Sequence, residues 1–297
     1  MLTQQLFNGV VIGSVYALFA LGFTLLFGVN HILNMAFGSV FMWGAFAGLY
    51  AVTVLDLPFW LALIAGMLGG GIVSCLVDLV AFMPLRRRQA PDFSGIVSSI
   101  GANLILLMIA QKVSNTQIMR FPFDTFPIVI FQVFGLRIQL LQLIIIGTAL
   151  LMVVVLVSLL YRTGLGRRIR SVAFSEGTSK LLGINSSLVN AQVFFLSGAM
   201  AGAAGVLIGL TFNSVHYLMG EPFLMQAFAV IILGGLGSIP GALLAGLLIG
   251  LVQAMSFAYI SSAAADAITF AVLFLIILVR PTGLFGKAST ILRVQRR

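Results

Sequence analysis

Few residues in this chain are of the types that carry out catalysis or bind metal ions. The two histidines, His31 and His216, lie far apart in the sequence, and the single cysteine, Cys75, lies inside an apolar run. A metal site needs several such ligands close together, and a lone cysteine cannot form an internal disulfide. No Ser/His couple or pair of acids marks an apolar run, and residues 283–288 lack the glycine spacing and the Ser/Thr of a Walker A loop. We therefore expect no enzyme activity, no bound ATP and no resident cofactor.

Three acidic residues lie in or beside apolar runs, where an ionisable group is by default a functional hypothesis. Asp78 precedes the basic cluster Arg86–Arg88, which favours an interfacial or ion-paired role. Glu221 precedes Pro222, and either a helix-start role or a pathway role is open, because acids stabilise helix N-termini. Asp266 is interpreted as a first-turn acid of the last run. All three lie near run ends, whereas an ion-coupled carrier would hold acids at mid-span, so the energy for transport is expected to come from elsewhere.

The composition excludes a soluble protein and a disordered one. Of the 297 residues, 61% are hydrophobic and only 8% are charged, and the mean hydropathy is +1.17. In soluble domains about a quarter of all residues are charged, and disordered chains combine low hydrophobicity with high net charge. The net charge of +9 does not indicate nucleic-acid binding, because no Lys/Arg face is interleaved with aromatic residues.

Apolar runs divided by short polar breaks indicate a polytopic membrane protein. A membrane-spanning helix needs about 20 apolar residues. Runs of this kind, or shorter pieces, cover residues 9–29, 35–55, 58–83, 94–111, 138–161, 188–211, 223–238, 241–260 and 263–279. The piece 223–238 is short and ends in Gly234-Gly235-Leu236-Gly237, which indicates a broken or re-entrant helix, tolerated only inside protein or beside a water-filled path. The sequence thus predicts one all-α transmembrane domain over residues 1–297, a helical bundle with eight to ten membrane elements.

The basic residues orient the chain in the bilayer. The loops 86–92 and 162–180 and the C-terminal tail hold thirteen of the sixteen Lys/Arg, and the segment 112–137 holds the other three. Loops rich in Lys and Arg remain on the cytoplasmic side. This distribution predicts nine crossings, with the N-terminus outside and the C-terminus inside.

Glycine is the second informative residue type. Many of the 32 glycines fall four residues apart inside apolar runs: Gly9/Gly13, Gly44/Gly48, Gly66/Gly70, Gly198/Gly202, Gly205/Gly209, Gly237/Gly241 and Gly246/Gly250. Small residues at this spacing let membrane helices approach closely, so a tightly packed bundle is expected. The run–break–run rhythm also suggests a weak two-half repeat, about 1–160 and 186–285, and paired interrupted helices point to a transport pathway.

The longest charged break, residues 162–187, is predicted to form a short amphipathic helix and a second short helix. Apolar residues recur at helical spacing among arginines: Ile169, Val172, Ala173 and Phe174, with Arg167, Arg168 and Arg170. Ser175 and Gly177 should break the first helix, and the second should run to Leu182 before Gly183. Such a segment either lies on anionic lipid headgroups or docks a cytoplasmic partner, and both roles are open.

Several stretches of the chain resemble one family of transport proteins. They are residues 162–170 followed by 181–185, the glycine-rich stretch 227–242, the stretch 279–286, and the shorter stretches 16–22 and 84–86. Over almost its whole length the chain resembles the LivH-like permeases of branched-chain amino acid ABC importers, the inner-membrane components of binding-protein-dependent transport systems. Permeases for urea and short-chain amides share these motifs, so the solute is open between the two classes, with an ion-coupled secondary carrier as a further alternative.

This resemblance implies an inner (plasma) membrane importer of several parts. The chain would pair with a second homologous permease subunit, two cytoplasmic ATP-binding subunits that carry ATP and Mg²⁺, and a periplasmic solute-binding protein. Its own role would be a solute path and a lever that receives force from the ATPases.

The resemblance and the sequence pattern together assign two sets of site residues. The predicted ATPase-coupling loop contains Gly164, Gly166, Arg167, Arg168, Arg170, Glu176, Leu182 and Gly183. The predicted translocation pathway contains Asn34, Phe37, Gly38, Glu221, Gln226, Gly234 and Gly235. No catalytic or metal-binding residue is expected.

Overall fold

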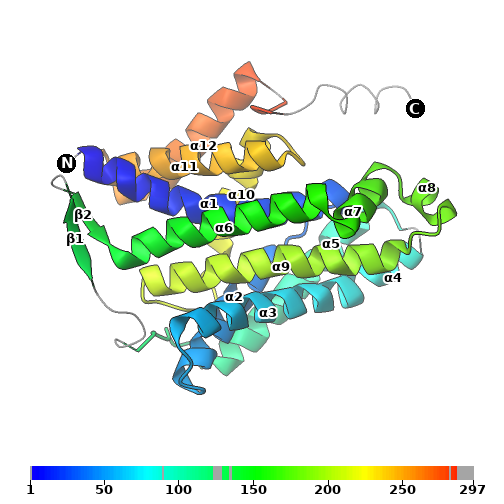
Figure 1. Ribbon diagram of the computed structural model, residues 1–297, viewed down its shortest axis with the longest axis horizontal. Helices are drawn as coiled ribbons and strands as arrows, with labels where there is room; N and C mark the ends of the chain where they lie inside the picture. Colours follow the sequence, from blue (N-terminus) through cyan, green and yellow to red (C-terminus); the bar gives the residue numbers. More distant parts are fainter. Residues whose placement is uncertain (1, 89, 123–128, 134–135, 281, 286–297) are drawn as a thin grey trace.

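The computed structural model describes residues 2–88, 90–122, 129–133, 136–280 and 282–285. Most of these residues form long apolar helices that run side by side along the longest axis of the molecule (Figure 1). A small β-hairpin lies at one end of this bundle, beside the N-terminus, and two short helices lie at the opposite end, α7 (Gly164–Phe174) and α8 (Glu176–Leu181).

The helices of the first half follow the predicted apolar runs. They are α1 (Leu2–Asn30), α2 (Phe37–Thr53), α3 (Phe59–Val77), the π-helical turn η1 (Asp78–Phe82), α4 (Met83–Arg87) and α5 (Asp92–Val113). The segment from α3 to α4 is one continuous helix that contains Pro84. Proline has no N–H for the carbonyl four residues before it, and a π turn is one way in which a helix accommodates such a defect. Here the Met83 N–H donates to the Asp78 carbonyl, five residues back.

The second half contains five more apolar helices. They are α6 (Leu140–Arg162), α9 (Ser186–Thr211), α10 (Gly220–Gly234), α11 (Ile239–Tyr259) and α12 (Ser262–Val279). The two short helices α7 and α8 join α6 to α9, as predicted for the charged break, and α7 ends at Phe174, next to Ser175. Gly177, which was expected to help break the helix, instead lies within α8.

The structure corrects three local predictions. The helix predicted from residue 223 begins at Gly220, so Glu221 and Pro222 lie in its first turn, which agrees with the helix-start role left open for Glu221. Asp266 lies beyond the first turn of α12, so it is not a first-turn acid. The outer segment 112–137 contributes a hairpin, β1 (Ile130–Val133) with β2 (Leu136–Gln139), paired antiparallel with Ile130 opposite Gln139. The regular structure of the described residues is therefore α-helical apart from this hairpin and one isolated bridge between Met119 and Val215.

The hairpin is tied to the start of α1 by one glutamine. The Arg137 N–H donates to Oε1 of Gln4 at 2.9 Å, and Nε2 of Gln4 donates to the Arg137 carbonyl at 3.0 Å. The side chain thus satisfies a donor and an acceptor of the exposed edge of β2. These bonds fix the N-terminus and the hairpin at the same end of the bundle.

Glycines allow the central helices to pack backbone to backbone. Gly44 of α2 and Gly66 of α3 both lie against Gly202 of α9. A Cβ atom on Gly44 or Gly202 would overlap backbone atoms of a neighbour, and one on Gly66 would overlap the Val206 side chain. A second seam joins α1 to α11, where Gly13 lies against Gly250. Because α1 and α9 are largely covered by other helices, they form the centre of the bundle. The close packing predicted from the glycine spacing is confirmed.

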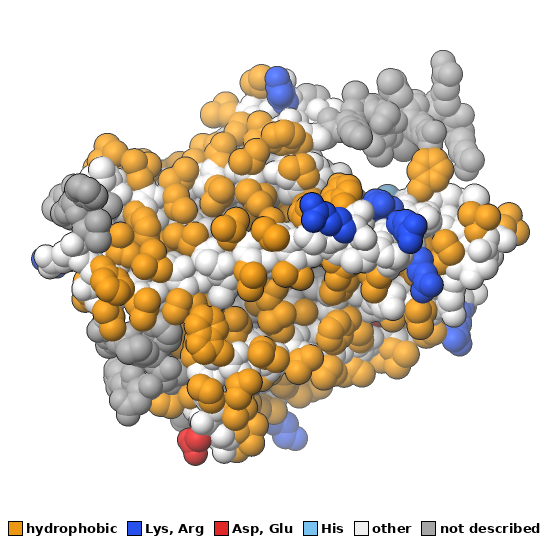
Figure 2. All heavy atoms as spheres, in the orientation of Figure 1, with side chains coloured by type: hydrophobic (Ala, Val, Ile, Leu, Met, Phe, Trp, Pro, Cys, Tyr) orange, Lys and Arg blue, Asp and Glu red, His pale blue; other side chains and the backbone are white. Residues whose placement is uncertain are grey.

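In the described part of the chain, six helical segments are long and apolar enough to cross a membrane, and three shorter apolar helices accompany them. The long segments are Leu2–Asn30, Phe59–Arg87, Phe93–Val113, Leu140–Arg162, Ser186–Thr211 and Ile239–Tyr259, and the short ones are Phe37–Thr53, Gly220–Gly234 and Ala264–Val279. A polytopic membrane protein is confirmed. Figure 2 shows hydrophobic side chains over most of the visible face and most of the visible Lys and Arg side chains near α7 and α8.

The basic residues of the two predicted cytoplasmic loops lie at one end of the structure. Arg86 and Arg87 end α4, and the basic residues of 162–180 lie at the end of α6 and on α7 and α8, whereas Arg137 lies in β2 at the opposite end (Figure 1). Basic residues gather on the cytoplasmic side of membrane proteins, so the α7–α8 end is the one that the sequence predicts to face the cytoplasm, and it is called the cytoplasmic end below. The basic tail residues Lys287, Arg293, Arg296 and Arg297 lie outside the described residues.

Candidate coupling surface and translocation pathway

The helix α7 is attached to the end of α6 by short-range interactions. The Thr163 hydroxyl caps α7 by accepting from the Gly166 N–H at 3.1 Å. Gly166 packs on the carbonyls of Leu159 and Leu160, where a Cβ atom would overlap both. The Arg170 guanidinium donates to the Leu160 carbonyl and lies 5.2 Å above the Tyr161 ring. Gly166 and Arg170 therefore hold α7 rigidly against the membrane helix.

The helix α8 is defined by a polar cap and a glycine turn. Ser175 separates it from α7, and its hydroxyl accepts from the Thr178 N–H at 3.3 Å. Glu176 and Lys180 form an exposed ion pair at 2.9 Å, one helical turn apart. Gly183 follows with φ of +77°, a left-handed conformation that favours glycine over residues with a Cβ. This turn redirects the chain into α9.

Three large apolar side chains on α7–α8 face solvent. Phe174 is 84% exposed, Leu181 is 89% exposed and Leu182 is 75% exposed. Exposed apolar groups beside basic ones mark an interaction surface. An open groove of about 450 Å³ lies between the two helices, lined by Arg167, Arg170, Ser171, Phe174, Ser175, Thr178, Ser179 and Leu182. Phe174, Leu182, Arg167 and Arg168 are called the coupling surface below.

The predicted coupling residues divide into two groups by the contacts they make, although Gly164, Arg170 and Glu176 of the second group are exposed as well. Arg167, Arg168, Leu182 and Gly183 are exposed at the cytoplasmic end and can meet a partner. The others support the segment from within or beside it: Gly164 begins α7, Gly166 and Arg170 attach α7 to α6, and Glu176 pairs with Lys180. The sequence pattern found the segment but did not separate these two groups.

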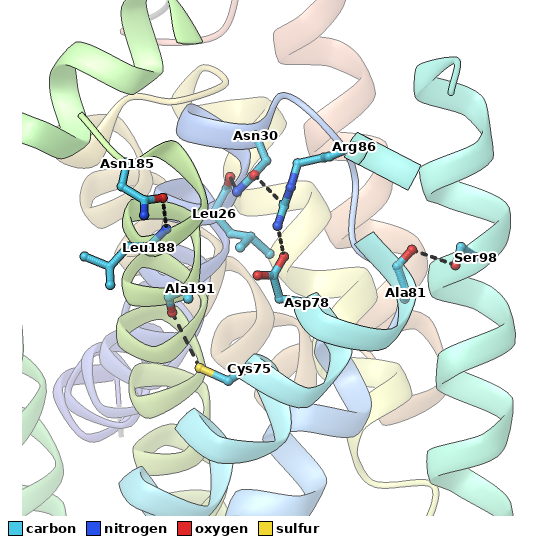
Figure 3. Close-up of polar contacts among 10 residues, drawn as sticks. All are labelled: Leu26, Asn30, Cys75, Asp78, Ala81, Arg86, Ser98, Asn185, Leu188 and Ala191. Atoms are coloured by element: carbon cyan, nitrogen blue, oxygen red, sulfur yellow. Dashed lines mark hydrogen bonds and ion pairs between the residues drawn. The ribbon is translucent and has the colours of Figure 1, made fainter. Parts of the chain in front are cut away.

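Behind the α7–α8 junction lies a cavity of about 240 Å³. Its walls come from the cytoplasmic ends of α1, α4, α5, α7, α8 and α9, and they include Asn30, His31, Arg86, Phe174, Glu176 and Asn190. Nearby, Nη2 of Arg86 donates to Oδ1 of Asp78 at 2.5 Å, and Nη1 of Arg86 donates to Asn30 at 3.3 Å (Figure 3). The predicted ion pairing of Asp78 is confirmed, and the cavity places this pair next to the coupling segment.

Removing the charge of Asp78 is expected to destabilise the cytoplasmic end of the bundle. Asp78 is 5% exposed, and Asp78→Asn would leave the partly buried Arg86 guanidinium without its counter-ion, which we expect to cost about 2–4 kcal/mol of unfolding free energy. Thermal unfolding of the purified protein would measure the change. The double variant Asp78→Asn/Arg86→Gln should recover part of the loss, because neither charge is then unpaired. Equal losses in the single and double variants would contradict this prediction.

The first group of predicted pathway residues lies at the break between α1 and α2. Asn34 is fully buried, and its Oδ1 accepts from the Ala36 N–H at 3.0 Å. Phe37 is also fully buried and stacks on Phe19 with the ring centroids 4.9 Å apart. Gly38 touches the backbone of Gly220, so the first turns of α2 and α10 meet inside the bundle. In the isolated chain these residues are packed and do not line an open channel.

The second group lies at the two ends of α10. Glu221 is exposed at its start. Gly234 lies against the backbone of Gly241, and Gly235 has φ of +96°, so both permit the tight turn into α11. Burial lowers the pKa of His216 in the preceding loop, so this loop adds no positive charge ahead of Glu221 at neutral pH.

Gln226, the remaining predicted pathway residue, belongs to a polar cluster inside the apolar helices. Its Nε2 donates to Oδ1 of Asp266 at 2.9 Å, and Nε2 of Gln253 donates to the same oxygen at 3.1 Å. The Tyr16 hydroxyl donates to Oε1 of Gln253. Sequence reasoning missed Tyr16 and Gln253 and misplaced Asp266. The available signal was the scarcity of polar side chains within the apolar runs of α1 and α11.

Comparison with known proteins decides the family. Residues 5–278 match the family described as branched-chain amino acid transport system / permease component. The chain belongs to this permease family. It is 33% identical to the high-affinity branched-chain amino acid transport system permease protein LivH of Salmonella typhimurium, over 96% of this chain and 95% of the relative. It is 32% identical to the permease protein BraD of Pseudomonas aeruginosa, again over 96% and 95%.

Among solved structures, the chain resembles PsaBC from Streptococcus pneumoniae, in complex with Fab, with a TM-score of 0.49 and 11% identity over 94% of this chain and 92% of that chain. The family and the six long apolar segments identify a multi-pass inner-membrane permease. The expected family is confirmed. Within the described residues, no group of three or more His, Cys, Asp or Glu side chains could hold a metal ion.

Proposed function

We propose that the permease is one of two membrane subunits of an ATP-driven importer for branched-chain amino acids. It would assemble with a second homologous permease, two cytoplasmic ATP-binding subunits and a periplasmic solute-binding protein. The observation that supports a contact with ATPase subunits is the coupling surface. Its Phe174 and Leu182 are large apolar side chains that are exposed near arginines at the cytoplasmic end. Identity to the LivH and BraD relatives supports the solute class.

The coupling segment is built to pass force to the membrane helices. Gly166 and Arg170 join α7 to α6. The cavity beside Ser175 is lined both by the α7–α8 junction and by the ends of α1 and α4, and α7 also contacts α1. A partner that pushes on Phe174 or Leu182 would therefore move α6 and α9 directly, since α7 and α8 are joined to them. The cavity gives the junction room to move toward Arg86. Closure of the ATPases would thus alter the bundle without any chemistry in this chain.

The arrangement of the helices supports nine membrane crossings with the N-terminus outside. In this arrangement the three shorter apolar helices, α2, α10 and α12, cross or enter the membrane along with the six long ones. The succession of a long helix, a non-helical break and a short helix occurs in α1–α2 and again in α9–α10. This recurrence, with Gly38 against Gly220 where the short helices begin, supports the proposed two-half organisation.

Cysteine labelling in whole cells tests the proposed orientation. In a Cys75→Ser background, Asp56→Cys and Gln132→Cys are expected to react with a membrane-impermeant maleimide from outside. Thr178→Cys on α8 should react only after the membrane is permeabilised, because its loop carries the basic residues that stay inside. Labelling of Thr178→Cys in intact cells would reverse the orientation.

Uptake by the complete importer tests the function itself. The permease, its partner permease, the ATPases and the binding protein would be produced together in cells that lack branched-chain amino acid uptake. Uptake of radiolabelled leucine that requires ATP and all the subunits is the expected result. Uptake of urea or a short-chain amide in place of leucine would support the runner-up solute class, whose permeases share the glycine-rich stretch 227–242. Gradient-driven uptake by the purified chain alone would support an ion-coupled carrier.

A further inference from the structure

The polar cluster around Asp266 lies within the membrane-spanning part of the bundle. Tyr16 is the central residue of α1, the longest apolar helix, and Gln226 is near the middle of α10. Gln253 lies in α11, more than one turn before its end. Four helices, α1, α10, α11 and α12, thus each contribute one polar side chain to the same place. Polar and ionisable side chains inside membrane helices are energetically costly, and they usually mark functional sites.

The cluster contains one exposed carboxylate, that of Asp266, which is held by buried side chains. Gln226 is 4% exposed, Gln253 is 5% exposed and Tyr16 is 6% exposed, whereas Asp266 is exposed. Both glutamine amides donate to Oδ1 of Asp266, and no described residue donates to Oδ2. Oε1 of Gln226 is buried without a hydrogen-bond partner among the described residues. The support therefore orients the carboxylate and leaves it able to accept further donors.

Lipid is a poor environment for this carboxylate. An aspartate within a membrane span costs about 2.5–3.5 kcal/mol when it faces hydrocarbon, so it faces a protein partner or a water-filled path. The other exposed side chains on the same helix, such as Phe270 and Phe274, are apolar. Asp266 is thus an isolated negative site on an apolar face.

The chemistry of the site fits one end of an amino acid. An ammonium group has three N–H donors, and hydrogen bonds between ionised groups are the strong ones. A solute carboxylate would instead be repelled. Phe223, which is partly exposed, packs on Tyr16 with the ring centroids 5.7 Å apart and on Phe41 at 4.9 Å. These rings provide an apolar wall beside the cluster, suited to a branched aliphatic side chain.

We infer that Asp266, positioned by Gln226 and Gln253, binds the α-ammonium group of the amino-acid solute during its passage through the permease. This inference rests on the proposed function, because it requires an amino acid as the solute. It also requires that the face formed by α10 and α12 lines the path, next to the second permease.

Uptake by the complete importer tests the binding role. Asp266→Asn keeps the shape of the side chain but removes its charge. We expect leucine uptake to fall about tenfold or more, because hydrogen bonds to charged groups contribute more binding free energy than neutral ones. Asp266→Glu keeps the charge and should retain more uptake than Asp266→Asn. Both variants should still assemble and show ATPase activity stimulated by the leucine-loaded binding protein. The matched control is Asp56→Asn in the exposed α2–α3 loop, where φ is +48°, a conformation that asparagine tolerates.

A labelling experiment tests separately whether the carboxylate faces water. Phe270→Cys, one turn from Asp266 on α12, would be made in the Cys75→Ser background. The measured quantity is the labelling rate of a cationic thiol reagent divided by that of an anionic one. This ratio should be about fivefold higher with Asp266 than in the Asp266→Asn variant, because a nearby negative charge attracts the cationic reagent. Leucine-loaded binding protein with ATP should slow the labelling.

Three results would overturn the inference: no labelling of Phe270→Cys by either reagent, Asp266→Asn uptake equal to that of the wild type, or an Asp266→Asn permease that no longer assembles. The last result would make Asp266 a structural group of the subunit interface. A wild-type importer that carries amides and not leucine would instead refute the proposed function, while the labelling would still report an aqueous carboxylate.

Discussion

Gly202→Val is expected to prevent accumulation of the folded permease. The side chain would enter the place where α2, α3 and α9 cross, because a Cβ on Gly202 overlaps the Gly66 carbonyl and lies 3.3 Å from the Gly70 Cα. These neighbours are backbone atoms that cannot rotate away, so three helices would have to separate. Overpacking of a core costs about 1–3 kcal/mol when side chains can adjust, and more when they cannot. Since proteins are stable by only about 5–15 kcal/mol, we expect most of the folded protein to be lost.

The chain offers a matched control for this substitution. Gly147 lies in the middle of α6, and a Cβ there meets nothing within 4 Å. Gly147→Val changes the same residue type on a membrane helix and is expected to leave the amount of folded protein unchanged. Detergent-extracted material analysed by size-exclusion chromatography and thermal unfolding would compare the two variants. Normal yield and unfolding temperature for Gly202→Val would show that the backbone contacts at the crossing do not determine the packing.

Arg168→Glu is expected to uncouple solute transport from ATP hydrolysis while the permease stays folded. Arg168 is exposed on α7 and forms no hydrogen bond or ion pair with the described residues, so its replacement costs little stability. Reversing its charge on the coupling surface would repel any partner group that accepts from it. A central charged residue of an interface contributes about 2 kcal/mol or more, so transport should fall at least about tenfold. Co-purification of the ATPase subunits and leucine uptake would be measured on the same membranes.

Gly183→Val extends this test to the turn after α8. Gly183 has φ of +77° and no atom near its missing side chain, so valine would strain the turn without a clash, and Leu182 beside it would be displaced from the coupling surface. Reduced transport with retained assembly is again expected. The control is Arg88→Gln in the other cytoplasmic loop, which should transport normally. Wild-type uptake by both Arg168→Glu and Gly183→Val would argue that the segment 162–187 lies on lipid headgroups and does not receive force.

The contacts of Asp266 could not be predicted from the spacing of residues in the sequence. In the sequence, Asp266 stands four residues into a run, and that position suggested a helix end. In the structure, the amides of Gln226 and Gln253 reach the same carboxylate from two other helices. Periodicity reports which residues share a face of one helix, but it carries no information on which helices are neighbours.

The sequence by itself determined the class of molecule. The scarcity of charge required a membrane environment, and the apolar runs predicted the helices to within a few residues except at the start of α1, which begins at Leu2 and not at residue 9. The basic loops predict the sides. The glycine spacing indicated close packing, and the motifs indicated the family. These properties follow from local composition, because each helix in a bilayer satisfies its own backbone hydrogen bonds.

Only the tertiary structure decided how these elements form a site. It distinguished Arg170, whose guanidinium donates to the Leu160 carbonyl and anchors α7, from Arg167 and Arg168, which are exposed. It also gathered Tyr16, Gln226, Gln253 and Asp266 from four helices into one cluster. The physical reason is that such contacts join residues distant along the chain, so their position depends on which backbones can approach. Glycine contacts such as Gly44 with Gly202 set that approach, and they exist only once the helices have packed.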